Sequence, residues 1–126
     1  EPFRELFQGR EDPDIDSILT YSKPYLPQHM ALGEMTLNAG NAIAFYKAGC
    51  DGIVDLSPFT CMNGIVTEAV YPIISRDHDH IPIRIFYFDG VSVDLDNDLD
   101  IFMDLVRLYH KKRQLVRRKD RIDSRV

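Results

Sequence analysis

The chain lacks the features that define several large classes of protein. No apolar run reaches the roughly 18 residues that a membrane-spanning helix needs. Neither GxGxxG nor GxxxxGK followed by Ser or Thr occurs, so nothing in the sequence argues for a nucleotide-binding phosphate loop. No internal repeat, low-complexity tract or signal peptide is visible. These absences leave an ordinary globular domain as the expectation.

Cysteine is scarce: the only two are Cys50 and Cys61. A small secreted domain held together by disulfides would normally use more. The two cysteines flank a predicted strand, which would separate them by roughly 15 Å. A disulfide needs Cα atoms within about 7 Å of each other. We therefore predict two free thiols and a reducing, cytoplasmic setting.

The length and composition are those of one domain over residues 1–126, with 44% apolar and 28% charged residues. A domain of this size buries roughly two-thirds of the surface that its unfolded chain exposes. The first residue is Glu1 rather than Met, so we expect a piece of a longer protein or a processed chain.

Charge is unevenly distributed, although the net charge is only −5. From Arg107 onward there are nine Lys or Arg and two Asp, against six basic and eighteen acidic residues before it. The acidic body disfavours general nucleic-acid binding. Residues 111–126 form a basic tail that we expect to fray. It is either a solvated helix end or a contact for an acidic partner or RNA.

Hydrophobic periodicity predicts helices that alternate with two strands. Connections of this length between strands imply parallel βαβ crossovers. We therefore predict an α/β fold, flavodoxin-like or Rossmann-like, whose small parallel sheet has flanking helices and is incomplete or is completed by a dimer. Pro58 should end the first strand, and Pro72 should kink the third helix or end it early. The predicted helices are 14–21, 34–48, 64–76 and 97 to at least 110; the strands are 53–56 and 81–88, with a possible short strand around 29–32.

Cys61 is the first candidate for chemistry, because it precedes a predicted helix at the carboxyl end of a strand. Open α/β sheets bind ligands at that end. A helix N-terminus stabilises a thiolate or a sulfur-bound cluster. Glu34 and Asp89 each lie beside a glycine at an element boundary and could face the same end of the sheet. An inert core thiol and simple capping roles for the two acids remain open.

Two other acidic segments resemble metal sites but fit poorly. Asp77 to His80 is a polar turn whose adjacent side chains rarely converge on one ion. Residues 94–98 match the first ligand positions of a calcium loop, but Leu99 and Leu105 stand where the loop needs glycine and glutamate. Helix capping explains the second segment better. His78 and His80 are also poorly placed to activate Cys61, because they follow the far end of the intervening helix.

A succession of short motifs resembles a known family. The motifs are Tyr25-Leu26-Pro27, Gly33-Glu34, Gly49-Cys50-Asp51-Gly52-Ile53-Val54, Pro58-Phe59-Thr60-Cys61-Met62, Ile81-Pro82 and Phe88-Asp89-Gly90. Over residues 24–110 the chain is similar to the C-terminal region of proteins related to 2-hydroxyacyl-CoA dehydratase and its activator, the CoA-substrate-specific enzyme activases. The family pattern has proline where this chain has Asn63.

The resemblance implies that Cys61 ligates an iron–sulfur cluster, such as [4Fe–4S], with Glu34 and Asp89 in the same cleft. A cubane cluster takes four thiolates. The other ligands would then come from N-terminal domains outside this sequence, and the piece would be inactive alone. The implied chemistry is low-potential electron transfer in anaerobes, driven by an ATP-hydrolysing activator module and directed to a CoA-thioester enzyme. The alternative is a non-catalytic interaction domain in which Cys61 is a structural thiol.

Overall fold

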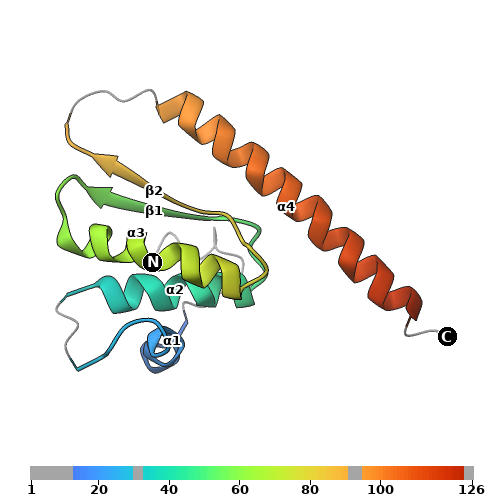
Figure 1. Ribbon diagram of the computed structural model, residues 1–126, viewed down its shortest axis with the longest axis horizontal. Helices are drawn as coiled ribbons and strands as arrows, with labels where there is room; N and C mark the ends of the chain where they lie inside the picture. The colour runs from blue at the N-terminus through green and yellow to red at the C-terminus, as the bar shows by residue number, and fades with distance from the viewer. Residues whose placement is uncertain (1–12, 30–32, 91–94, 124–126) are drawn as a thin grey trace, which may run out of the picture.

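The protein is an α/β domain with a two-stranded parallel sheet and flanking helices, as the sequence predicts. The computed structural model describes residues 13–29, 33–90 and 95–123, the last five by their backbone alone. Helices α1 and α2 precede the first strand, α3 connects the two strands, and α4 ends the described chain (Figure 1). The elements are α1 (Ile15–Ser22), α2 (Met35–Lys47), β1 (Ile53–Pro58), α3 (Met62–Asp77), β2 (Ile83–Phe88) and α4 (Leu95–Asp123).

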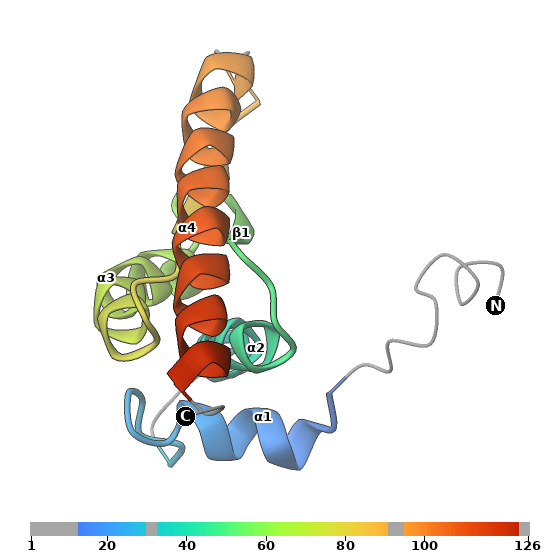
Figure 2. The same cartoon turned by 90° about the vertical axis from the view of Figure 1, so that its right-hand side faces the viewer.

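The sheet separates the helices into layers. Strands β1 and β2 pair in register from Ile53 opposite Ile83 to Pro58 opposite Phe88. Helices α2 and α3 lie together on one side of the sheet with α1 beneath them, and α4 crosses the other side (Figures 1 and 2). Side chains alternate between the two faces of a strand. The core lies on the α2–α3 side, where Ile53 packs with the buried residues Ala39, Ala42, Ile43, Tyr71, Ile74 and Ile81.

Helices α1 and α2 approach each other closely at a glycine. Asp14 caps α1 by accepting a hydrogen bond from the backbone N–H of Ser17. A Cβ atom on Gly40 of α2 would lie only 2.8 Å from the carbonyl carbon of Ile18. The α2 helix therefore packs directly against α1 at Gly40. Gly49 follows α2 in the left-handed region, at φ +93°, and ends the helix.

A charged cluster holds α4 against the start of β1. The guanidinium of Arg113 donates to the carbonyls of Gly49 and Cys50 at 2.8 and 3.1 Å and to the carboxylate of Asp51 at 2.9 Å. The Nδ1 atom of His110 lies 2.6 Å from the other carboxylate oxygen of Asp51. The α4 helix continues beyond residue 110, as far as Asp123.

The structure tests the predicted effects of two prolines. The strand β1 ends at Pro58, as predicted, two residues beyond the predicted range 53–56. The N–H groups of Ile53 and Phe59 donate to the carbonyls of Pro82 and Phe88. The N–H groups of the even-numbered residues of β1 therefore point away from β2, so a proline at position 58 loses no bond to that strand. Pro72 lies inside α3, which continues to Asp77, so the early end predicted as one alternative is wrong.

The structure also differs from the sequence prediction in which faces of α3 and α4 are buried. The three- and four-residue spacing of Val66, Ala69, Val70, Ile73 and Ile74 predicts that they share the buried stripe of α3. Ala69 and Ile73 are exposed, and Thr67 and Tyr71 are buried instead. On α4, Leu99 and Leu105 are likewise exposed, whereas Phe102 is buried. The strand suggested around 29–32 falls largely outside the described residues. None of the described helices is long and apolar enough to cross a membrane.

Candidate functional site

Cys61 lies at the N-cap of α3, immediately after the strand β1. Thr60 takes a left-handed conformation, with φ 66°, and turns the chain from the strand into the helix. The N–H of Cys61 donates to the carbonyl of Pro58 at 3.1 Å, which closes this turn. The Cys61 side chain remains partly exposed, so the alternative prediction of a fully buried core thiol is not met.

The start of α3 favours the thiolate form of Cys61. The backbone N–H groups of Gly64 and Asn63 lower the pKa of this thiol, and the hydroxyl of Ser57 adds to the effect. Desolvation and the negative charge of Glu34 act in the opposite direction without cancelling it. The sulfur forms no capping hydrogen bond of ordinary geometry, so the N–H groups act on it as oriented dipoles.

Small residues bring the neighbouring elements close to Cys61. A Cβ atom on Gly64 would lie 2.9 Å from the Cβ of Ser57, so α3 begins in direct contact with the end of β1. A Cβ atom on Gly33 would lie 2.7 Å from Oδ1 of Asn63, which places the start of α2 beside the start of α3. That Oδ1 atom is buried and has no hydrogen-bond partner in the described part of the chain.

Of the two predicted carboxylates, Glu34 acts on Cys61. Glu34 is the N-cap residue of α2, and its charge reaches the thiol. Asp89 follows β2 at the same end of the sheet and is exposed. Both therefore lie at the carboxyl ends of the strands, but the structure joins only Glu34 to Cys61 by an interaction that changes the thiol's pKa.

Three exposed apolar residues lie within four positions of Cys61 in the sequence, and we define the apolar collar as Phe59, Met62 and Ile65. Their exposed fractions are 60, 62 and 56%. The N–H of Phe59 donates to the carbonyl of Phe88 at 2.9 Å, so the collar continues onto the end of β2. Clustered apolar side chains around a reactive group are typical of a surface that another protein surface covers.

The remaining sequence candidates lie elsewhere. Cys50 precedes β1, and both thiols are free, as predicted. The Nδ1 atom of His78 lies 2.7 Å from the carbonyl oxygen of Ile74, in a turn at the far end of α3. Asp98, from the calcium-like segment, pairs with Arg84 at 3.8 Å. Within the described ranges, no three His, Cys, Asp or Glu residues are grouped to hold a metal ion.

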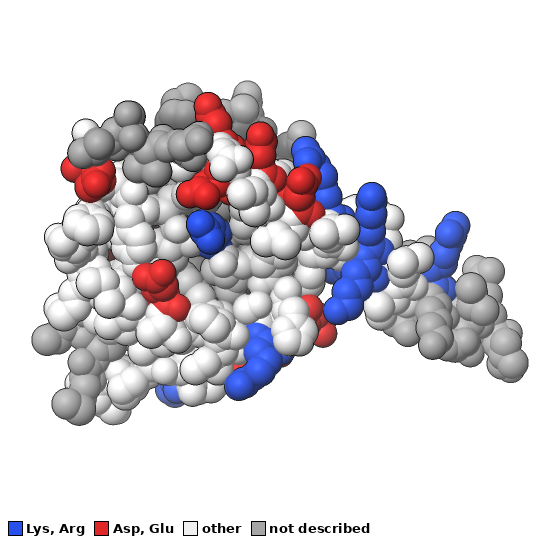
Figure 3. All heavy atoms as spheres, turned by 45° about the horizontal axis from the view of Figure 1, so that its top comes forward, with Lys and Arg blue, Asp and Glu red and all other residues white. Residues whose placement is uncertain are grey.

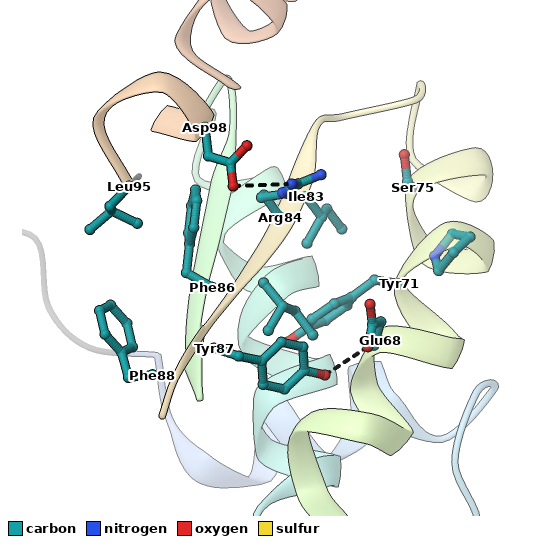
Figure 4. Close-up of a pocket in the computed structure, with 12 residues that line it drawn as sticks. Glu68, Tyr71, Ser75, Ile83, Arg84, Phe86, Tyr87, Phe88, Leu95 and Asp98 are labelled. Atoms are coloured by element: carbon teal, nitrogen blue, oxygen red, sulfur yellow. Dashed lines mark hydrogen bonds and ion pairs between the residues drawn. The ribbon is translucent and has the colours of Figure 1, made fainter. Parts of the chain in front are cut away.

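A groove along β2 was not predicted from the sequence. It has a volume of about 720 Å³ and runs between α3 and the first turn of α4 (Figure 4). Phe86 and Phe88 line the side next to α4, and the hydroxyl of Tyr87 donates to Glu68 of α3 at 2.7 Å. Tyr87 also lies against Gly64, so this residue contacts both the groove and the start of α3. The aromatic residues of β2 were the available signal.

Comparison with protein-family models, with curated proteins and with solved structures gives no match. The functional reading of the Cys61 site therefore depends on its geometry and on the motifs quoted above.

Proposed function

We propose that this chain is the C-terminal α/β domain of a cytoplasmic iron–sulfur protein related to 2-hydroxyacyl-CoA dehydratase or its activator. In this proposal the Cys61 thiolate supplies one ligand of a cluster that transfers electrons at low potential. The main support is the position of a partly exposed thiol, with a lowered pKa, at the N-terminus of α3. The motif resemblance over residues 24–110 supplies the family and the reaction class.

The residues at the site fit one corner of a cluster. A cluster ligand must be a thiolate, and the N–H groups of Gly64 and Asn63 favour that form of Cys61. Cys50, at the opposite end of β1, is not placed to be a second ligand. Three further thiolates would come from other domains of the same protein. The bound cluster would supply one-electron chemistry, and oriented N–H dipoles around the sulfur would adjust its potential.

The surface around Cys61 fits an enclosed site between domains. The exposed side chains of Phe59, Met62 and Ile65 would pack against the covering domain and keep water from the sulfur. Glu34 and Asp89 would lie at the rim of that contact. The negative charge of Glu34 opposes the thiolate, so its role would be to tune the site rather than to ligate iron. The partners would be an ATP-hydrolysing activator and a CoA-thioester enzyme.

The test compares two matched variants, Cys61→Ser and Cys50→Ser, in the complete parent protein purified without oxygen. Iron content, acid-labile sulfide and visible absorption are measured, with circular dichroism as the control for folding. Cys61→Ser should lose or alter the cluster, whereas Cys50→Ser should keep it. Unchanged iron and an unchanged spectrum in Cys61→Ser would refute the ligand assignment and favour the non-catalytic interaction domain.

A further inference from the structure

Helix α4 carries two apolar stripes, and the sheet covers only one of them. Phe102 and Tyr109 are buried beneath the helix. The second, which we call the outer stripe, consists of Ile101, Leu105, Leu108 and Leu115. Their exposed fractions are 55, 52, 63 and 66%.

The spacing of the outer stripe is that of a helix-pairing seam. Its residues follow one another at intervals of four, three and seven, which are the intervals of a heptad repeat. From Ile101 to Leu115 the stripe runs about 21 Å along the helix, at 1.5 Å per residue. Lys112 occupies the seam position between Leu108 and Leu115. Single exposed leucines are ordinary on a protein surface, but four exposed apolar residues in such a row mark a contact surface.

The charges on α4 select the partner and its direction. Acidic side chains gather over the first half of the helix and basic side chains over the second half (Figure 3). Two α4 helices side by side in parallel would place like charges together. An antiparallel pair places the acidic half of each helix beside the basic half of the other. The acidic residues of the first half are Asp96, Asp98, Asp100 and Asp104, with Arg107 as its one basic residue; the exposed basic residues of the second half, within the described side chains, are Lys111, Lys112, Arg117 and Arg118.

We propose that a second copy of this chain binds to the outer stripe through its own α4, antiparallel and related by a two-fold axis near Leu108. A two-fold axis uses the same surface on both copies, and the helix is complementary to itself only in this direction. The ion pairs that α4 forms within its own chain do not block this dimer. Arg113 turns inward to Asp51, and the pair between Arg107 and Asp104 is exposed to solvent. Because the stripe is short, the dimer is weak and dissociates on dilution.

The test measures the oligomeric state of the chain by sedimentation over a range of protein and salt concentrations. The unmodified chain should show a concentration-dependent dimer that weakens as salt rises. The double variant Leu105→Asp, Leu108→Asp should raise the dimer's Kd by about 100-fold or more, since two buried leucines are lost. Ile73→Asp, at an exposed apolar position of α3, is the matched control and should leave the Kd unchanged.

Charge reversal tests the antiparallel direction. Asp100→Lys with Asp104→Lys should weaken the dimer, and so should Lys111→Glu with Lys112→Glu. Combining all four changes in one chain should restore part of it, because the acidic and basic positions nearest the two-fold axis have then exchanged signs. A monomer at every concentration, or a dimer that survives Leu105→Asp, Leu108→Asp, would overturn the proposal. Failure of the fourfold variant to recover would overturn the antiparallel direction.

Discussion

Replacing Gly64 by alanine tests whether the contact between α3 and β1 forms the Cys61 site. Two effects oppose each other. Alanine gains up to about 1 kcal/mol of helix propensity over glycine. The added Cβ, however, would lie 2.9 Å from the Cβ of Ser57, an atom fixed to the strand, and 3.3 Å from a ring carbon of Tyr87. Overpacking of this kind costs about 1–3 kcal/mol.

We expect the overpacking to win, because Ser57 Cβ cannot move without moving β1. Urea unfolding of Gly64→Ala should show a net loss of about 1–2 kcal/mol with an unchanged m-value. The start of α3 must also shift, which moves two N–H groups away from the sulfur. The pKa of Cys61, measured from the pH dependence of its alkylation, should therefore rise in the variant.

A double-mutant cycle isolates the contact. Ser57→Gly removes the atoms that the new methyl group meets, so it should recover most of the loss when combined with Gly64→Ala, with a coupling of about 1–2 kcal/mol. If Gly64→Ala alone is about 1 kcal/mol more stable than the unmodified protein, the gain in helix propensity exceeds the cost of overpacking. The close contact, and the positioning of Cys61 that depends on it, would then be refuted.

Two further substitutions test the charged cluster that anchors α4 and the backbone N–H of Asn63, the position at which the family pattern has proline. Arg113→Lys keeps the charge but cannot replace the hydrogen bonds of Arg113 to the two backbone carbonyls and to the Asp51 carboxylate. The free energy of unfolding in urea should therefore fall by about 1–3 kcal/mol. The exposed control Arg118→Lys should leave it almost unchanged. Asn63→Pro removes one of the N–H groups that lower the pKa of Cys61, so the alkylation midpoint should move to higher pH. A midpoint that does not move would contradict that role for the N–H.

Local patterns in the sequence predict most of the architecture. The spacing of Met35, Ala39, Ala42 and Ile43 identifies the buried face of α2, and the β-branched and aromatic residues of β2 identify the second strand. Parallel pairing follows from the length of the connection between the strands. The prediction is weaker where tertiary packing decides which face of a helix is buried. Tyr71 is buried on α3 because its hydroxyl donates to Asp55 at 2.7 Å, a contact that periodicity cannot reveal.

The Cys61 site, too, could be predicted only in part from local sequence patterns. Its place at a helix start after a strand follows from the turn residues around it. The lowered pKa depends on contacts between elements that are separate in the sequence, such as Gly64 against Ser57 and Gly33 against Asn63. The outer stripe of α4 could not be recognised from periodicity alone, because Leu105 falls between the two stripes in the pattern and only packing shows which stripe the sheet covers.

The most direct measurement of the central claim is the alkylation of Cys61 in the unmodified parent protein, before and after its iron is removed by a chelator under anaerobic conditions. A thiolate that ligates iron is protected while the metal is bound and, given its lowered pKa, reacts rapidly once the metal is gone. The account predicts that Cys61 is labelled only after iron removal, while Cys50 is labelled equally in both states. Equal labelling of Cys61 before and after iron removal would contradict the account.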